Sequence, residues 1–176
     1  ITAMAIDGKA PYKNVLTHGF VVDGEGKKMS KSLGNVISPQ NILKDYGADI
    51  LRLWVMSSDY SEDVRLSMEI LMRLADAYKK IRNTYKYLLS NLFDFEPKRD
   101  RVPYKNLLEI DRWILSELSS LMKDAACNYD AYAFHRVYRS VYNFCVYEVS
   151  SIYLDILKDR MYTNKRDSLE RRSGQT

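Results

Sequence analysis

SMEILMRLADAYKKIRNTYKYLLSNLF, residues 67–93, is the stretch that decides the fold. Its apolar and aromatic residues recur at alternating spacings of three and four, at Leu71, Leu74, Tyr78, Ile81, Tyr85, Leu88 and Leu92. Residues at this spacing share one face of an α-helix. The stretch therefore predicts one long amphipathic helix whose apolar face packs against the rest of the protein.

Two further stripes of the same period follow along the chain. The second consists of Leu107, Ile110, Ile114, Leu118, Leu121 and Ala125. The third consists of Phe134, Tyr138, Val141, Cys145, Val149, Ile152 and Ile156, with Asp130 as the residue that caps its helix. Residues 93–104, which contain Pro97 and Pro103, are expected to be a loop. Three long helices with short connections predict an antiparallel bundle, so the fold class is mainly α.

Towards the N-terminus the pattern changes to short elements. VLTHGFVVD, residues 15–23, is typical of a strand, and Ser38-Pro39 is typical of a helix start. Two short helices are expected, one ending near Tyr46 and one over residues 49–57. A polar connection then suggests three parts: residues 1–59, a helical domain over residues 60–162, and a frayed tail over residues 163–176, which lacks an apolar stripe.

The composition excludes several classes of protein. The chain has 176 residues, of which 46% are hydrophobic and 28% charged, so a disordered or collagen-like protein is excluded. No apolar run approaches the roughly 20 residues that span a bilayer, so we expect no membrane partner and a cytoplasmic location. Cys127 and Cys145 lack zinc-pair spacing and are expected to be reduced core thiols. The chain starts like a domain interior, which suggests a segment of a longer protein.

One segment has the composition of a phosphate-binding loop. GKKMSKSLGN, residues 26–35, combines flexible lysines with small serines between glycines. Lysine is a compact positive charge suited to a triphosphate, and the flanking glycines would let the loop close over a nucleotide and reopen. From composition alone, a solvated surface turn is the commoner explanation for such a segment.

KMSKS at Lys28 to Ser32 resembles the second signature motif of class I aminoacyl-tRNA synthetases. Residues 12–55 are similar to the subgroup for aliphatic amino acids, namely isoleucyl, valyl and leucyl. YGADILRLWVMSSDY (46–60), KKIRNTYKYLLSNLFDF (79–95), LEIDRWILSEL (108–118) and SIYLDILKDRMYT (151–163) resemble the isoleucyl branch. The resemblance extends to about Asp167. It implies the C-terminal end of a Rossmann-type catalytic domain followed by an α-helical anticodon-binding domain.

This resemblance implies activation of isoleucine by ATP, with Mg²⁺ in the parent enzyme, and transfer to tRNA(Ile) by a monomeric protein. Lys31 and Lys28 would stabilise the phosphate charge of the transition state, and no acid or base role is needed. Ser30 and Ser32 would donate hydrogen bonds to ATP, and Met29 would anchor the closed loop. The HIGH-type first signature, the editing domain and a cysteine-rich zinc module are absent from these residues, so the segment alone should be inactive and bind no metal.

Basic residues on two of the predicted helices are candidates for RNA contact. Lys79, Arg82 and Lys86 share one face of the first long helix, and Arg136 and Arg139 share one side of the third. Tyr132 and Tyr142 could stack an unpaired base beside the second group. Ordinary solvated faces are the alternative, because the net charge is only +4.

Three other interpretations remain open at this point. The chain could belong to a valyl-type synthetase, since nothing in its periodicity encodes isoleucine. It could be a non-catalytic RNA-binding helical module, in which case the KMSKS segment would be dispensable. It could also be a structural bundle that binds nothing, which the nearly balanced charge would suit.

Overall fold

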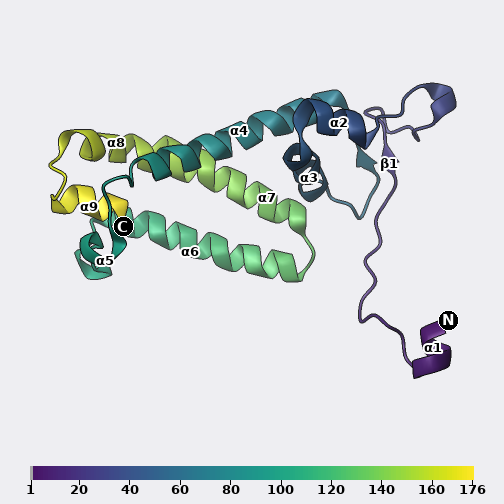
Figure 1. Ribbon diagram of the computed structural model, residues 1–176, viewed down its shortest axis with the longest axis horizontal. Helices are drawn as coiled ribbons and strands as arrows, with labels where there is room; N and C mark the ends of the chain where they lie inside the picture. The colour runs from purple at the N-terminus through teal and green to yellow at the C-terminus, as the bar shows by residue number, and fades with distance from the viewer. Residues whose placement is uncertain (1) are drawn as a thin grey trace. The chain divides into compact units, whose positions relative to one another are not determined.

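The computed structural model describes residues 2–176, which are mostly helical (Figure 1). The chain forms two compact units. The first comprises residues 2–37 and Tyr60–Ser67, and the second comprises Ser38–Asp59 and Met68–Thr176. The prediction of a mainly α protein is confirmed.

The first unit is built around a short parallel pair of strands. Its elements are α1 (Thr2–Asp7), β1 (Val21–Val22), the 3₁₀ turn η1 (Lys31–Leu33) and β2 (Val64–Arg65). Val21 pairs with Val64, and Val22 pairs with Arg65. The sequence predicted a strand over residues 15–23, but only Val21 and Val22 form one. Residues 9–20 run as an extended connection between α1 and β1 (Figure 1).

Gly19 lies where the backbone that leads into β1 comes close to the backbone that leads into β2. Its backbone N–H donates to the carbonyl of Tyr60 at 2.9 Å. A Cβ at this position would lie 2.2 Å from the carbonyl oxygen of Glu62, well inside contact distance. The close approach of the two backbones therefore requires glycine here.

The second unit begins with two short helices that end at turns. They are α2 (Pro39–Tyr46) and α3 (Ala48–Ser57). Ser38 caps α2, because its hydroxyl accepts the N–H of Asn41 at 3.3 Å, and Pro39 is the first helical residue, as predicted. α3 packs against α4 (Met68–Ser90) and α7 (Phe134–Asn143) and buries Ile50 and Trp54.

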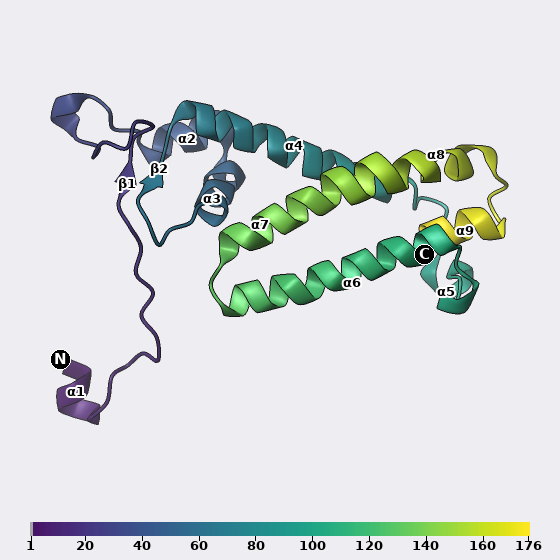
Figure 2. The same cartoon turned by 180° about the vertical axis from the view of Figure 1, so that it is seen from behind.

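The long helices form an up-down-up arrangement, as the sequence predicted. Their elements, besides α4 and α7, are α6 (Glu109–Asp130), the π-helix η3 (Phe144–Tyr153) and α8 (Leu154–Thr163). α6 runs antiparallel to the continuous α7–η3–α8 rod, which both views show (Figure 2). η3 packs against both α4 and α6. The loop predicted over residues 93–104 contains one helical turn, α5 (Pro97–Asp100), and the 3₁₀ turn η2 (Tyr104–Asn106) begins at its end.

The π-helix changes which residues of the third stripe are buried. Up to Val149 the predicted stripe holds, but Ile152 and Ile156 are 45% and 49% exposed, while Tyr153 and Leu157 are buried. In a π-helix each N–H bonds to the carbonyl five residues earlier, so the turn is wider than in an α-helix. The apolar face therefore moves one residue along the chain, a shift that a constant helical period does not anticipate.

The predicted stripes were also wrong at other positions. Tyr85 and Leu118 are exposed, at 55% and 38%. Thr84 is buried instead, and its hydroxyl lies 2.9 Å from that of Ser150 on η3. Asp130 does not cap the third helix, because it lies at the end of α6, and α7 begins at Phe134.

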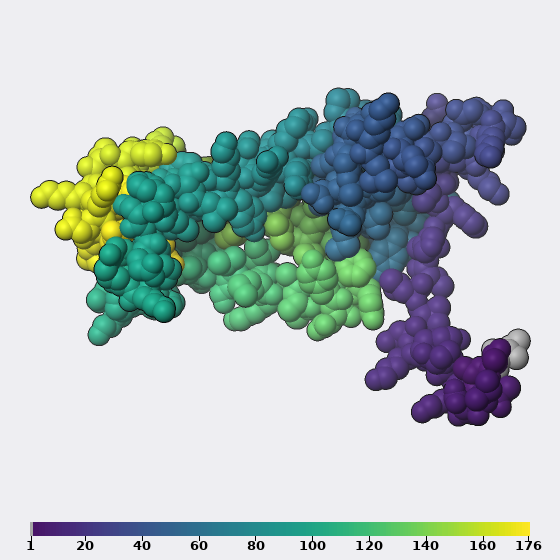
Figure 3. Space-filling view, in the orientation of Figure 1, coloured from purple at the N-terminus to yellow at the C-terminus, as the bar shows by residue number. Residues whose placement is uncertain are grey.

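The C-terminal residues are ordered as a helix, contrary to the frayed tail expected over residues 163–176. α9 (Leu169–Gln175) is capped by Ser168 and buries Arg171, Ser173 and Gln175. The absence of an apolar stripe misled the prediction, because this helix is held by buried polar contacts. The space-filling view shows the C-terminal residues, coloured yellow, against residues around α5 (Figure 3).

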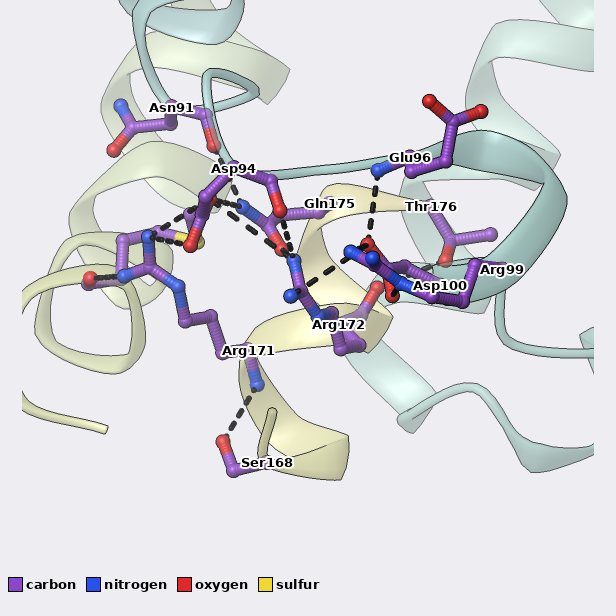
Figure 4. Close-up of polar contacts among 11 residues, drawn as sticks. Asn91, Asp94, Glu96, Arg99, Asp100, Ser168, Arg171, Arg172, Gln175 and Thr176 are labelled. Atoms are coloured by element: carbon purple, nitrogen blue, oxygen red, sulfur yellow. Dashed lines mark hydrogen bonds and ion pairs between the residues drawn. The ribbon is translucent and has the colours of Figure 1, made fainter. Parts of the chain in front are cut away.

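Two carboxylates anchor α9. Asp94 accepts both Nη2–H bonds of Arg171 at 3.2 Å and the amide of Gln175 at 2.8 Å, and Arg172 bonds the Asp94 carbonyl at 2.9 Å (Figure 4). Burial would raise the pKa of Asp94, but its bonds to Gln175 and Arg171 outweigh burial and hold that pKa below its usual value. Asp111, the second anchor, accepts from Ser173 and from the guanidinium of Arg160.

The two cysteines differ in their exposure to solvent. Cys145 is buried as expected, but Cys127 is exposed, so the prediction of two core thiols was wrong for Cys127.

Among residues 2–176, none of the helices is both long and apolar enough to cross a bilayer.

Candidate functional site

The KMSKS loop opens with a tight turn at the end of β1. The N–H of Asp23 donates to the carbonyl of Lys27 at 2.9 Å, and the N–H of Gly26 donates back to the carbonyl of Asp23 at 3.0 Å. Gly26 has a φ of +85°, a conformation that favours glycine. A bridge between Val22 and Lys28 follows. The backbone of Lys28 is therefore tied to the strand pair.

The second half of the loop is a capped 3₁₀ turn. Ser30 caps η1, because its hydroxyl accepts the N–H of Leu33 at 3.3 Å, and it lies 3.1 Å from the hydroxyl of Ser32. The turn closes at Gly34, whose φ of +68° is left-handed and whose N–H donates to the carbonyl of Lys31 at 3.2 Å. The two hydroxyls predicted to contact ATP are thus within hydrogen-bond distance of each other, and that of Ser30 also caps the turn.

Two side chains outside the motif join the ends of the loop. The Asp23 carboxylate accepts the N–H groups of Glu25 and Lys27 at 3.0 and 2.8 Å and the side-chain amide of Asn35 at 2.8 Å. The oxygen of that amide accepts the N–H of Ser30 at 2.9 Å. These contacts, led by the bond from Asn35, hold the pKa of Asp23 below its usual value.

The lysines of the loop differ in their contacts. Lys27 pairs with Glu25 at 2.8 Å. Lys28 and Lys31 are exposed and make no ion pair within residues 2–176, whereas Met29 is half-buried. Their positive charges are therefore not neutralised by the protein around them, which is the condition for attracting a polyphosphate.

The candidate RNA-binding residues lie on the outer faces of α4 and α7. Lys79 pairs with Asp76 at 3.2 Å. The other four, Arg82, Lys86, Arg136 and Arg139, are exposed and without an ion pair in the described part of the chain. Lys79, Arg82 and Lys86 belong to α4, whereas Arg136 and Arg139 belong to α7. The basic candidates therefore come from two different helices of the bundle.

The two tyrosines expected beside the RNA have different surroundings. Tyr142 is engaged by Lys80, whose Nζ lies 3.3 Å from the hydroxyl and 5.9 Å from the ring centroid. Tyr132 is exposed, has a φ of +57°, and meets Phe134 edge-on at 6.2 Å. Tyr132 is thus partly exposed beside Phe134, while Tyr142 connects α7 to α4 through Lys80.

A pocket that sequence patterns did not indicate lies between α4, η3 and α8. Its volume is about 500 Å³, and Lys80, Tyr87, Ser150 and Lys158 are among its lining residues. Burial, with the neighbouring Tyr162, raises the pKa of Tyr87 to about 12. Within residues 2–176, no group of three or more His, Cys, Asp or Glu side chains is placed to hold a metal ion.

Two family profiles match the chain. The profile for tRNA synthetases class I (I, L, M and V) matches residues 1–67, and that for the anticodon-binding domain of tRNA ligase matches residues 111–176. Residues 1–67 belong to the class I tRNA synthetase family. The KMSKS loop lies in the first match, and Arg136 and Arg139 lie in the second. α4, with Lys79, Arg82 and Lys86, falls between them.

Relatives of this synthetase segment match it over its whole length. Isoleucine–tRNA ligases of Caldanaerobacter subterraneus subsp. tengcongensis and Persephonella marina are 58% and 56% identical over 176 residues, which is 100% of this chain and 19% of each relative. The chain thus spans about a fifth of the length of the relatives it matches.

A solved structure shares the fold. It is the LeuRS–tRNA–LeuAMS ternary complex of Agrobacterium radiobacter, with a TM-score of 0.64 and 18% identity over 90% of this chain and 18% of that one. At this identity the likeness concerns the fold alone.

The residues that the sequence analysis missed are those that hold the loop. Asp23 is the last residue of the predicted strand and Asn35 the last residue of the predicted loop, but no pattern rule connects residues twelve apart through side chains. The signal that could have found them is the pairing of a turn-forming Asp after the strand with an Asn after the closing glycine.

Proposed function

We propose that this chain is a segment of an isoleucine–tRNA ligase. The observation that carries the proposal is the 52–58% identity, over essentially the whole chain, to relatives named isoleucine–tRNA ligase. The enzyme would activate isoleucine with ATP and transfer it to tRNA(Ile). This segment would supply the KMSKS loop and helices that bind the tRNA.

Lys31 and Lys28 would stabilise the charge that develops as the isoleucine carboxylate attacks the α-phosphate and pyrophosphate leaves. Their unpaired ammonium groups support this role, because charge held in place before the reaction lowers the barrier most effectively. Met29 would anchor the loop, and Ser30 and Ser32 would supply donors once the loop closes. Mg²⁺ is expected to accompany the ATP, held by phosphate oxygens and groups outside this segment.

The test compares three neighbouring lysines in the full-length enzyme. Isoleucine-dependent exchange of pyrophosphate into ATP should fall on the order of 10²- to 10³-fold in Lys31→Ala and substantially in Lys28→Ala, as for other preorganised groups. Lys27→Ala is the matched control, because Lys27 already pairs with Glu25, and it should stay within a few-fold of wild type. Equal losses at all three positions would contradict the assignment.

The same assay separates the alternatives. If valine supports exchange at least as efficiently as isoleucine does, the enzyme is of the valyl type. If neither amino acid supports exchange while tRNA still binds, the non-catalytic RNA-binding module is the better description.

The RNA-binding faces need a separate experiment. Substituting Arg82, Lys86, Arg136 or Arg139 by Gln should weaken tRNA(Ile) binding and reduce its salt dependence by about one unit of slope for each phosphate that the side chain no longer neutralises. Lys79→Gln should have less effect, because Asp76 already pairs with Lys79. Arg73→Gln, on the same helix but paired with Glu69, is the control. Unchanged binding in all four variants would indicate solvated faces.

A further inference from the structure

The base of the KMSKS loop is closed by two side chains, and each holds the backbone directly beside a lysine of the motif. Asp23 fixes the N–H of Lys27, the residue before Lys28. Asn35 fixes the N–H of Ser30, the residue before Lys31, and its amide also donates to the carbonyl of Lys28 at 3.3 Å. The bond between Asp23 and Asn35 then joins the two halves.

We propose that Asp23 and Asn35 form a clasp that positions Lys28 and Lys31 for the phosphate charge of the activation step. This inference rests on the proposed ATP chemistry of the loop. Both clasp residues are positioning residues, because they would act on ATP only through the backbone of the lysines.

The position of each lysine charge depends on its backbone, which the bridge from Val22 to Lys28 and the turn closed at Gly34 also help to hold. The lysine side chains are exposed and form no ion pair within residues 2–176, so their placement depends on the backbone that carries them. A charge that must be ordered during the reaction stabilises the transition state less than one already in place. The clasp fixes both backbone segments before the reaction, so the lysine charges would need less ordering during it.

The hydrogen bonds also fix which way the Asn35 amide points. Its oxygen must face the N–H of Ser30, and its nitrogen must face two acceptors, the Asp23 carboxylate and the Lys28 carbonyl. An aspartate at position 35 would therefore put two carboxylates together. An asparagine at position 23 would need its single side-chain oxygen to accept the N–H groups of Glu25 and Lys27. Its NH₂ group would then face the NH₂ group of Asn35.

Exchanging the two residues should restore the bond with reversed polarity. In the double variant Asp23→Asn/Asn35→Asp, the new amide at position 23 donates to the new carboxylate at position 35, and both still accept their backbone N–H groups. The longer hydrogen bond to the Lys28 carbonyl has no replacement, and the new carboxylate would face that carbonyl oxygen, so the rescue should be partial. Rescue by the exchange would show a direct interaction, because two independent structural roles would give additive damage.

The test is made in the full-length synthetase by isoleucine-dependent pyrophosphate exchange, with kcat and KM measured separately. Asp23→Asn and Asn35→Asp should each lower kcat on the order of 10- to 100-fold, the range for losing a hydrogen bond to a charged group. The KM for isoleucine and the melting temperature should change little. The exchanged double variant should recover about tenfold over the weaker single variant. Glu25→Gln, an exposed neighbour outside the clasp, is the matched control.

The outcomes separate this inference from the proposed function. If the wild-type enzyme shows no isoleucine-dependent exchange, the proposed function fails. If the wild-type enzyme is active but the single variants match Glu25→Gln, or the double variant is no better than the singles, the clasp is overturned. If the losses follow melting temperature, and kcat per folded molecule is unchanged, the two residues serve folding alone and the positioning role is rejected.

Discussion

Replacing Arg160 by methionine should destabilise the helical unit, because it leaves a buried carboxylate without its counter-charge. Asp111 is 2% exposed, and its oxygens accept Nη2–H and Nη1–H of Arg160 at 2.6 and 3.1 Å. Tyr153 donates its hydroxyl to the same carboxylate at 2.8 Å, and Ser173 donates a further bond. Methionine keeps much of the length of the arginine stem but neither donates nor carries charge.

The size of the effect follows from what remains around Asp111. Removing one partner of a buried ion pair costs roughly 3–5 kcal/mol. The hydroxyls of Tyr153 and Ser173 still reach the carboxylate, so we expect the lower end, about 3 kcal/mol. For a protein of this size, about 1 kcal/mol corresponds to roughly 2–4 °C, so the melting temperature should fall by about 6–12 °C.

Urea and thermal unfolding, followed by the circular dichroism of the helices, would measure this loss. Lys158→Met is the control: it lies on the same helix, but its pair with Asp155 is half-exposed and should be worth less than about 1 kcal/mol. Adding Asp111→Asn to Arg160→Met should restore part of the stability, because a neutral amide needs no counter-charge. A loss for Arg160→Met no larger than that of Lys158→Met would refute this account of the network.

Three further predictions concern α9 and the cysteines. Gly174→Ala should lower the free energy of unfolding by about 1–3 kcal/mol in urea titrations, because the added Cβ would lie 2.3 Å from Cδ1 of buried Leu157. The pKa of Asp94 is lowered by folding, so its contribution is present above the unfolded carboxyl pKa, about 3.9, and is lost as pH falls through the folded value. The stability gap between wild type and Asp94→Asn should therefore shrink in acid; a gap constant from pH 7 to 3 would contradict this. A thiol reagent should label exposed Cys127 in the native protein well before Cys145, whose pKa is raised by burial and by Glu148.

The helical bundle was predicted well from the sequence because an amphipathic stripe depends only on the spacing of apolar residues along the chain. Ser38 and Pro39 gave the start of α2 for the same reason, since capping is local. The stripe failed after Val149, where the wider π turn shifts burial to Tyr153 and Leu157. Nothing in a single helical period marks such a change of pitch.

The remaining differences arise from polar contacts between distant residues. α9 has no apolar face to recognise, and its order comes from Asp94 and Asp111, which lie far back in the chain. In the loop, the motif residues were found from their composition, but the bond between Asp23 and Asn35 becomes visible only once the turn brings them together. Pairing of this kind depends on tertiary geometry, which composition does not contain.

The anchoring of α9 also affects how the protein emerges from the ribosome. Asp94 is separated from Arg171 by 77 residues. At a synthesis rate of about 5–20 residues per second, these 77 residues take roughly 4–15 s to be made. During that time the carboxylate of Asp94 lacks its partners from α9, as does that of Asp111 once it has been made, and the unit cannot complete its polar core. A pause in synthesis before Ser168 would therefore prolong the exposure of an incomplete bundle to chaperones and proteases.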